Sequence, residues 1–86
     1  MKVQIPTPLR SYTAGAKHVD AMGATLDELL ADLDARYPGL RFRVVDEQGR
    51  LRQHMRIFVN RDIEDDLTTP VGADDEVVLM QALSGG

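Results

Sequence analysis

The sequence predicts an α+β fold in which a mixed sheet of four or five strands packs on one main helix. One strongly amphipathic helical segment, at residues 25–37, lies between two groups of strand-like segments. The first and last of these, at residues 2–5 and 76–82, are both rich in apolar residues, so both are expected at the centre of the sheet. A length of 86 residues allows one domain with a modest core.

The composition excludes several classes of function. The chain has no cysteine, which excludes disulfides, thiolate zinc sites and thiol nucleophiles and fits a reducing cytoplasm. No apolar run is long enough to predict a signal peptide or a membrane span. The net charge of −4 argues against a general nucleic-acid binder. We therefore expect a cytoplasmic protein with no nucleic-acid or membrane partner.

The chain begins with a predicted β-hairpin. Residues 2–5 alternate between polar and apolar, as a half-buried strand does, and Pro6 and Pro8 end its regular pairing. A turn at residues 13–15 leads to a second, weakly alternating strand at residues 17–21.

The helix has signals for its start, its buried face and its end. Thr25 is a good N-cap, and Glu28 three residues later completes a capping-box pattern. One stripe at helical spacing carries the apolar residues Leu26, Leu29, Leu30, Leu33 and Tyr37. Asp32 and Arg36 are spaced for an ion pair on the wet side. The helix is expected to end at residues 37–39, Tyr-Pro-Gly.

The second half of the chain predicts more strands and no second long helix. Residues 40–53 are expected to form a strand or coil, and residues 55–60 alternate clearly as a strand. Its predicted inner face carries Met55, Ile57 and Val59. A turn at 60–62 and an acidic connector at 64–70 lead to the last strand at 76–82.

This order of elements is that of a β-grasp, or ubiquitin-like, fold. The alternative is a ferredoxin-like split βαβ fold, which needs a second helix among the later strands. The connector at 64–70 is too short for that helix and lacks an apolar stripe, so the β-grasp fold ranks first.

Residues 1–82 are expected to form the domain, and residues 83–86 a flexible tail that ends in Gly85 and Gly86. Four or five extended residues reach roughly 13–18 Å, enough to enter a partner's active site. Glycines suit a narrow tunnel because they carry no side chain. A terminal carboxylate is ionised at neutral pH and a poor electrophile, so acyl chemistry requires activation, usually adenylation by ATP. The alternative is an inert frayed end, which is common in arbitrary domains.

Five segments of the chain resemble the MoaD/ThiS family of ubiquitin-like sulfur carriers. They are VQIP at 3–6, TLDELLADLDARYPGL at 25–40, IFVN at 57–60, GADDEVVLM at 72–80 and LSGG at 83–86. The stretches IPTPLRSYTAG and LRQHMRIFVN are most similar to the carriers that feed thiocarboxylate sulfur into cysteine synthesis.

The resemblance implies a carrier protein that acts with partner enzymes and needs no catalytic side chain or bound cofactor of its own. An E1-like enzyme, using ATP and magnesium, would adenylate Gly86, and sulfur transfer would give a thiocarboxylate. A PLP-dependent cysteine synthase would accept this sulfur, and a metalloprotease would release the cysteine. One alternative is the small subunit of molybdopterin synthase, paired with its large subunit. Another is a conjugated modifier or a ubiquitin-like interaction module with an inert tail.

Partner docking is predicted on the outer face of the sheet and at the root of the tail. The predicted docking residues are Arg56, Phe58, Leu79, Gln81, Leu83 and Ser84. This assignment turns Leu79 and Gln81 outward; the opposite phase, with Val78 and Met80 outward, stays open because both faces of the last strand are apolar. The non-functional alternative is that Phe58 and Leu79 pack against the connector.

Other candidate constellations are weak. His18 and His54 have no metal-ligand spacing, and the pairs at 65–66 and 74–75 lack the regular oxygen spacing of a cation-binding loop. A local basic cluster comprises Arg50, Arg52, Arg56 and Arg61. These arginines either assist docking or balance nearby acids.

Overall fold

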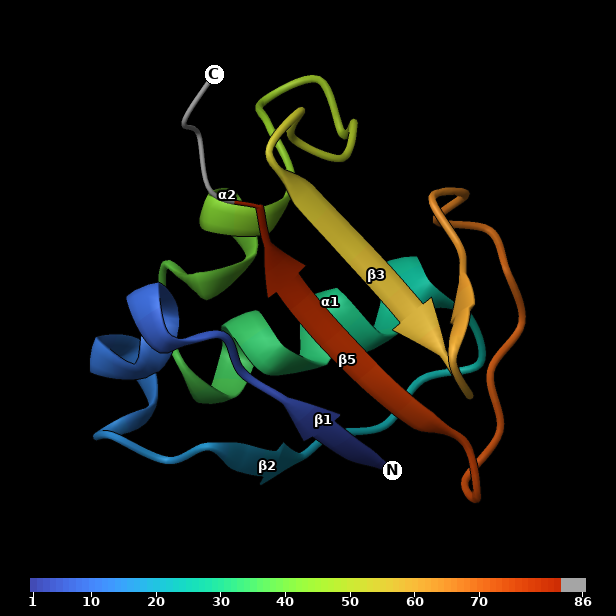
Figure 1. Cartoon of the computed structure of the whole chain (residues 1–86), viewed down its shortest axis with the longest axis horizontal. Helices are drawn as coiled ribbons and strands as arrows, with labels where there is room; N and C mark the ends of the chain where they lie inside the picture. Colours follow the sequence, from blue (N-terminus) through green and yellow to red (C-terminus); the bar gives the residue numbers. More distant parts are fainter. Residues whose placement is uncertain (83–86) are drawn as a thin grey trace.

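The computed structural model describes residues 1–82, which form a five-stranded mixed sheet with one long helix across one face (Figure 1). The strands are β1 (Lys2–Gln4), β2 (His18–Asp20), β3 (Met55–Val59), β4 (Asp62–Ile63) and β5 (Glu76–Gln81). Their order is β2-β1-β5-β3-β4, with β1 parallel to β5 and the other pairs antiparallel. The predicted α+β, β-grasp architecture is confirmed, and so is the central position of the first and last strands.

Helix α1 (Leu26–Arg36) begins at the predicted cap. The Glu28 backbone N–H donates to Thr25 Oγ1 over 3.2 Å, and the Glu28 carboxylate in turn accepts from the Ala24 N–H over 3.1 Å. The predicted ion pair joins Arg36 Nε to Asp32 Oδ2 at 3.0 Å. The start of the helix is therefore fixed by its side-chain cap, and the exposed ion pair adds a few tenths of a kcal/mol along its second half.

The core lies between α1 and the inner face of the sheet. The leucines of the helical stripe are buried against the inward side chains of the strands. The largest fully buried side chains are Ile5, Leu9, Leu26, Leu29, Leu30, Leu33, Leu40, Met55, Ile57, Leu79, Val3 and Val44. Each contributes about 1.5–3 kcal/mol relative to an exposed position, so an almost wholly aliphatic core holds the fold together.

A 3₁₀ helix, η1 (Thr7–Thr13), connects β1 and β2, and the sequence did not predict it. Pro6 and Pro8 end β1 as expected, and Pro8 also suits the first turn of a helix because its φ is fixed and its missing N–H needs no partner there. Leu9 is buried in this helix and anchors the connection to the core.

The expectation of strand or coil at residues 40–53 is wrong at its start, where a short helix, α2 (Leu40–Val44), forms. Asp34 Oδ1 accepts from the backbone N–H groups of Gly39 (3.1 Å) and Arg41 (3.2 Å), which caps the new helix from α1. Gly39 has a φ of 95°, which a glycine adopts without strain. Leu40 and Val44, four residues apart, both point into the core.

Strands β3 and β4 are joined by a two-residue loop, Asn60 and Arg61, both at positive φ (50° and 77°). The Asn60 side chain supports this loop: its Nδ2 donates to Asp75 Oδ1 over 2.8 Å, and its Oδ1 accepts from the Glu76 N–H over 3.0 Å. The turn at 60–62 is thus confirmed, but the sequence did not indicate the short strand β4 that follows it.

Candidate docking site

The outer face of the sheet, opposite α1, exposes a small apolar surface. Residues paired across antiparallel strands share a face, and the register pairs Arg56 with Met80 and Phe58 with Val78. Met80 is 46% exposed, and Phe58 and Val78 are half-buried. In Figure 1, α1 crosses behind β3 and β5 and leaves this face in front. We call Phe58, Val78 and Met80 the outer patch.

The prediction that Leu79 and Gln81 face outward from the last strand is wrong. Leu79 is 1% exposed and Val77 is fully buried, and Gln81 lies half-buried on the same inner side. The pairing of Ile57 with Leu79 sets this phase, because the inner face of β3 is fixed by its own buried residues. Leu79 is therefore a core residue that no partner can reach, while the predicted outward positions of Phe58 and Arg56 are confirmed.

The outer patch forms the floor of an open hollow of about 470 Å³. Asn60, Arg61 and Glu76 complete its wall. Asp75 lies beside this rim, and its pKa is lowered, first by the hydrogen bond from the Gly72 N–H and then by the one from the Asn60 side chain. The hollow thus combines an apolar floor with an ionised polar rim, as docking surfaces do.

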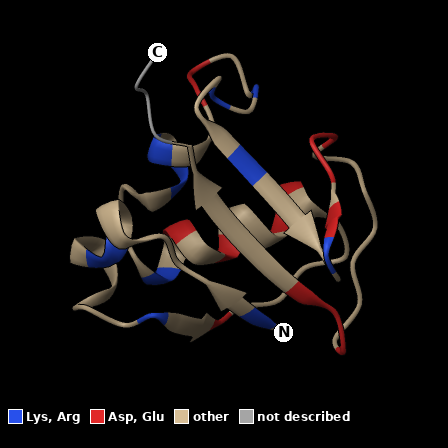
Figure 2. Cartoon of the chain, in the orientation of Figure 1, with Lys and Arg blue, Asp and Glu red and all other residues tan. Residues whose placement is uncertain are grey.

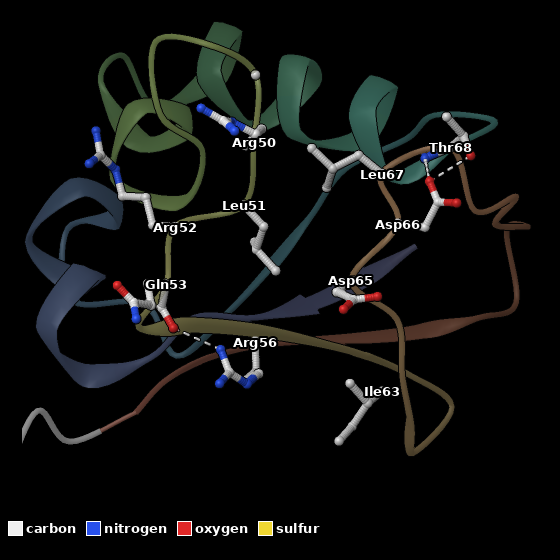
Figure 3. A pocket seen from close by; sticks show the side chains of 11 residues that line it. Arg50, Leu51, Arg52, Gln53, Arg56, Ile63, Asp65, Asp66, Leu67 and Thr68 are labelled. Atoms are coloured by element: carbon white, nitrogen blue, oxygen red, sulfur yellow. Dashed lines mark hydrogen bonds between the residues drawn. The ribbon is translucent and has the colours of Figure 1, made fainter. Parts of the chain in front are cut away.

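A second open cleft, of about 680 Å³, lies between the loop before β3 and the connector after β4 (Figure 3). The predicted basic cluster is divided here: Arg50, Arg52 and Arg56 line this cleft, whereas Arg61 lines the hollow of the outer patch. Arg56 Nη1 donates to the backbone oxygens of Gln53 (2.9 Å) and Met55 (2.8 Å), which ties this guanidinium to the start of β3.

The opposite wall of this cleft carries Asp65 and Asp66. The Asp66 carboxylate accepts from the Thr68 hydroxyl (2.7 Å) and the Thr68 N–H (2.9 Å), and these bonds lower its pKa (Figure 3). Both bonds reach the same oxygen, Oδ1, and hold it in a turn of the connector. Within residues 1–82, no group of three or more His, Cys, Asp or Glu side chains is placed to hold a metal ion.

The end of β5 borders a third, smaller hollow of about 280 Å³. The Ala82 N–H donates to the His54 backbone oxygen over 2.7 Å and continues the ladder with the start of β3. The residues that line this hollow are Phe42, Arg43, Arg52, His54 and Gln81. The predicted docking residues Leu83 and Ser84, and the predicted sulfur-bearing Gly85 and Gly86, lie outside the described residues.

The β-grasp fold places this chain in the class of small ubiquitin-like domains, and its exposed outer patch is a surface on which a partner can dock. The sequence model of the ThiS family matches residues 3–86, and the chain belongs to this family. The chain is 37% identical to the sulfur carrier protein CysO of Mycobacterium tuberculosis, over 98% of this chain and 96% of that protein. The same relationship confirms the prediction of a carrier protein rather than an enzyme.

The chain is also similar to solved structures of CysO and SAMP1 in its three-dimensional fold. The crystal structure of M. tuberculosis CysO is 36% identical with a TM-score of 0.89 and covers 95% of this chain and 98% of that chain. In the BexX/CysO complex of Amycolatopsis orientalis, the matching chain is 34% identical with a TM-score of 0.90, over 99% and 98% of the two chains. SAMP1 of Haloferax volcanii is 30% identical with a TM-score of 0.79, over 100% and 98%.

No helix within residues 1–82 has the length and apolar character that a membrane span requires.

Proposed function

We propose that this chain is a sulfur carrier of cysteine biosynthesis that carries its sulfur as a thiocarboxylate on Gly86. The observation that supports this most is the similarity to the sulfur carrier protein CysO over nearly the whole of both chains. In the proposed reaction, the terminal carboxylate attacks the α-phosphorus of ATP and releases pyrophosphate. A sulfide equivalent then displaces AMP from the acyl-adenylate and leaves the thiocarboxylate.

The partners of this function are enzymes with their own cofactors. An E1-like enzyme supplies ATP and magnesium for adenylation, and a PLP-dependent synthase accepts the sulfur before a metalloprotease frees the product. The complex of A. orientalis CysO with BexX supports the idea that a carrier of this kind forms stable complexes with its partners. No cofactor is assigned to this chain itself.

The outer patch, with Arg56 at its edge, is the proposed docking site for the activating enzyme. Its three apolar side chains lie on β3 and β5, the two strands whose adjacent ends lead toward the tail. Docking there buries Met80 and completes the cover of Phe58 and Val78, while residues 83–86 extend toward the enzyme's active site. Leu83 and Ser84, at the root of the tail, are proposed to contact the entrance of that site.

Intact-mass measurement tests the carrier function. The full chain is incubated with its activating enzyme, ATP, magnesium and a sulfide source, and we expect the mass gain of one oxygen replaced by sulfur. A variant that lacks Gly86 should show no such gain. An unchanged mass of the wild-type chain, while the same enzyme preparation hydrolyses ATP to AMP in its presence, would overturn the proposal.

A second candidate function is that of a protein modifier, favoured by the 30% identity to small archaeal modifier protein 1. The discriminating observation is covalent attachment of the Gly86 carboxyl to lysines of other proteins, visible as higher-mass forms of the chain in cell extracts. The alternative of a molybdopterin synthase subunit predicts a different partner: the synthase large subunit would co-purify in place of a PLP-dependent enzyme.

A further inference from the structure

The charges of this acidic protein are distributed unevenly along the chain. Residues 40–56 contain five arginines and two acids, a net charge of +3, whereas residues 57–82 contain one arginine and seven acids, a net charge of −6. Figure 2 shows basic segments on α2, on the loop before β3 and on β3, and acidic segments along the connector and at the start of β5. The basic part therefore includes the end of the molecule where β5 finishes.

We infer that the hollow at the end of β5 is a docking site for carboxylate side chains on the partner enzyme that receives the tail. This inference rests on the proposed function and adds the chemistry of the partner surface. The hollow is lined by Arg43, Arg52 and His54 around Phe42, and Gln81 at the end of β5 completes it. An enzyme that takes in the tail must approach this surface, because Ala82 is bonded directly to His54.

Within residues 1–82, no acidic side chain is paired with either arginine of this hollow, so both can bind an external carboxylate. Arg41, on the same short helix, is already paired with Asp27 at 3.1 Å. By contrast, neither Arg43 nor Arg52 forms an ion pair with any residue of the described part of the chain. The acid next to them, Asp46, accepts hydrogen bonds from the Gln48 and Arg50 N–H groups of its own turn at Oδ1. It forms no ion pair with either arginine within residues 1–82, although the pKa of Asp46, lowered mainly by the bond from the Arg50 N–H, is lowered further by the charge of Arg52.

Arg52 is held in position before any partner arrives. Its Nε donates to the Phe42 backbone oxygen over 2.7 Å, and its guanidinium carbon lies 4.7 Å from the centroid of the Phe42 ring. These contacts fix the plane of the guanidinium and leave its terminal nitrogens available for a bidentate bond to a carboxylate. Because the side chain is already ordered, binding loses less conformational entropy. Phe42, 53% exposed, adds an apolar contact beside the charge.

The charge pattern favours a local cluster of protein carboxylates over a long polyanion such as RNA. A polyanion that crossed this end of the molecule would also meet the acidic connector, and unscreened repulsion acts over about 8–10 Å at physiological ionic strength. A compact acidic rim on a folded enzyme contacts only the basic part. The remaining occupant is a second copy of this chain, whose residues 57–82 are themselves acidic; this is one outcome of the test.

The test compares two charge reversals of equal size. Arg43 and Lys17 are both exposed, and Lys17 precedes the edge strand β2. We measure ATP-dependent thiocarboxylate formation against carrier concentration for wild type, Arg43→Glu and Lys17→Glu. At low ionic strength we expect Arg43→Glu to raise KM about tenfold with little change in kcat, and the difference to shrink at high salt. Lys17→Glu should remain within about twofold of wild type.

Equal KM values for the two variants would overturn the inference, and so would a difference that is insensitive to salt. If wild-type chain self-associates and Arg43→Glu abolishes this, the occupant is a second copy and the inference is wrong.

A binding assay without turnover separates these outcomes from failure of the carrier function. In an NMR titration of the full chain with a short polyglutamate peptide, the amide signals of Arg43 and Arg52 should shift and that of Lys17 should not. Uniform or absent shifts would contradict the inference, even if no thiocarboxylate forms with any variant.

Discussion

The two faces of the β3–β5 pair carry similar apolar side chains, yet they have different surroundings. The inner face carries Met55, Ile57, Val77 and Leu79, all at most 1% exposed. The outer face carries Phe58, Val78 and Met80, which no helix of residues 1–82 covers. The comparison teaches that an apolar residue in a strand stabilises the domain only where another element covers it. On the open face, the same kind of residue is available to a partner.

Truncation on the inner face should have the largest effect. Leu79→Ala removes buried methyl groups and leaves a cavity between β5 and α1, so we expect the free energy of unfolding to fall by about 3 kcal/mol. Chemical denaturation monitored by circular dichroism measures this change. Met80→Ala on the outer face is the matched control and should lose less than about 1 kcal/mol. Equal losses in the two variants would remove the distinction between the faces.

A charge on the outer face should affect docking and leave the fold intact. Met80→Glu places a carboxylate on the outer patch, where burial under a partner would require its desolvation. We expect the KM for loading of the carrier by its activating enzyme to rise about tenfold, equivalent to about 1.4 kcal/mol, while the melting temperature changes little. Lys17→Gln, which also lowers the net charge by one, serves as the control for net charge. Loading at the wild-type KM would show that the activating enzyme docks elsewhere.

The loop at the rim of the outer face offers a smaller, stabilising change. Arg61 adopts a φ of 77°, which costs a non-glycine residue about 1–2 kcal/mol. Two-residue hairpin loops with two positive φ angles favour Asn-Gly, so Arg61→Gly should raise the free energy of unfolding by about 0.5–1 kcal/mol. Differential scanning calorimetry reports the shift in melting temperature. Asn60→Gly is the contrasting variant and should destabilise, because Asn60 bonds both Asp75 and Glu76. A lower melting temperature for Arg61→Gly would mean that its side chain supports the fold.

Acid should lower the stability of the domain, because it protonates surface aspartates that accept hydrogen bonds in the folded state. The pKa values of Asp32, Asp46, Asp66 and Asp75 are all lowered, mainly by hydrogen bonds that their carboxylates accept. The folded state therefore binds fewer protons than the unfolded state as the pH approaches the ordinary aspartate pKa of about 3.9. This stabilisation is complete above that pKa and is lost as the pH falls through the lower folded values. We expect the melting temperature to fall below about pH 4, and to fall less steeply in Asp75→Asn. A melting temperature that rises on acidification would contradict this sign.

Helix α1 could be predicted closely because its signals are local. The cap at Thr25, the leucine stripe and the Tyr-Pro-Gly ending all act within a few residues of the helix, and each is present in the structure. The central positions of β1 and β5 could also be predicted from their apolar residues, although only β5 is apolar on both faces and β1 alternates between polar and apolar.

The phase of β5 and the helix α2 could not be predicted, for two physical reasons. Periodicity decides which residues point inward only when one face of a strand is polar, and both faces of residues 77–80 are apolar. Helix α2 depends on a carboxylate in another element, because Asp34 caps the N–H groups of Gly39 and Arg41. The exposed position on β5 is therefore Met80 and not the predicted Leu79, while docking on β3 and β5 stays a proposal.

The pairing of Lys2 with Glu76 has a consequence for how the protein is made. Strand β5 lies between β1 and β3 and is the only strand that joins the β1–β2 ladder to the β3–β4 ladder in the described sheet. A two-stranded hairpin is marginal by itself, so a nascent chain cannot acquire its native sheet until the ribosome has delivered residues 76–81. Proteolysis within these residues would interrupt the strand that holds the two ladders together. Every copy that is folded has therefore been translated at least as far as residue 81, close to the glycine proposed to carry sulfur.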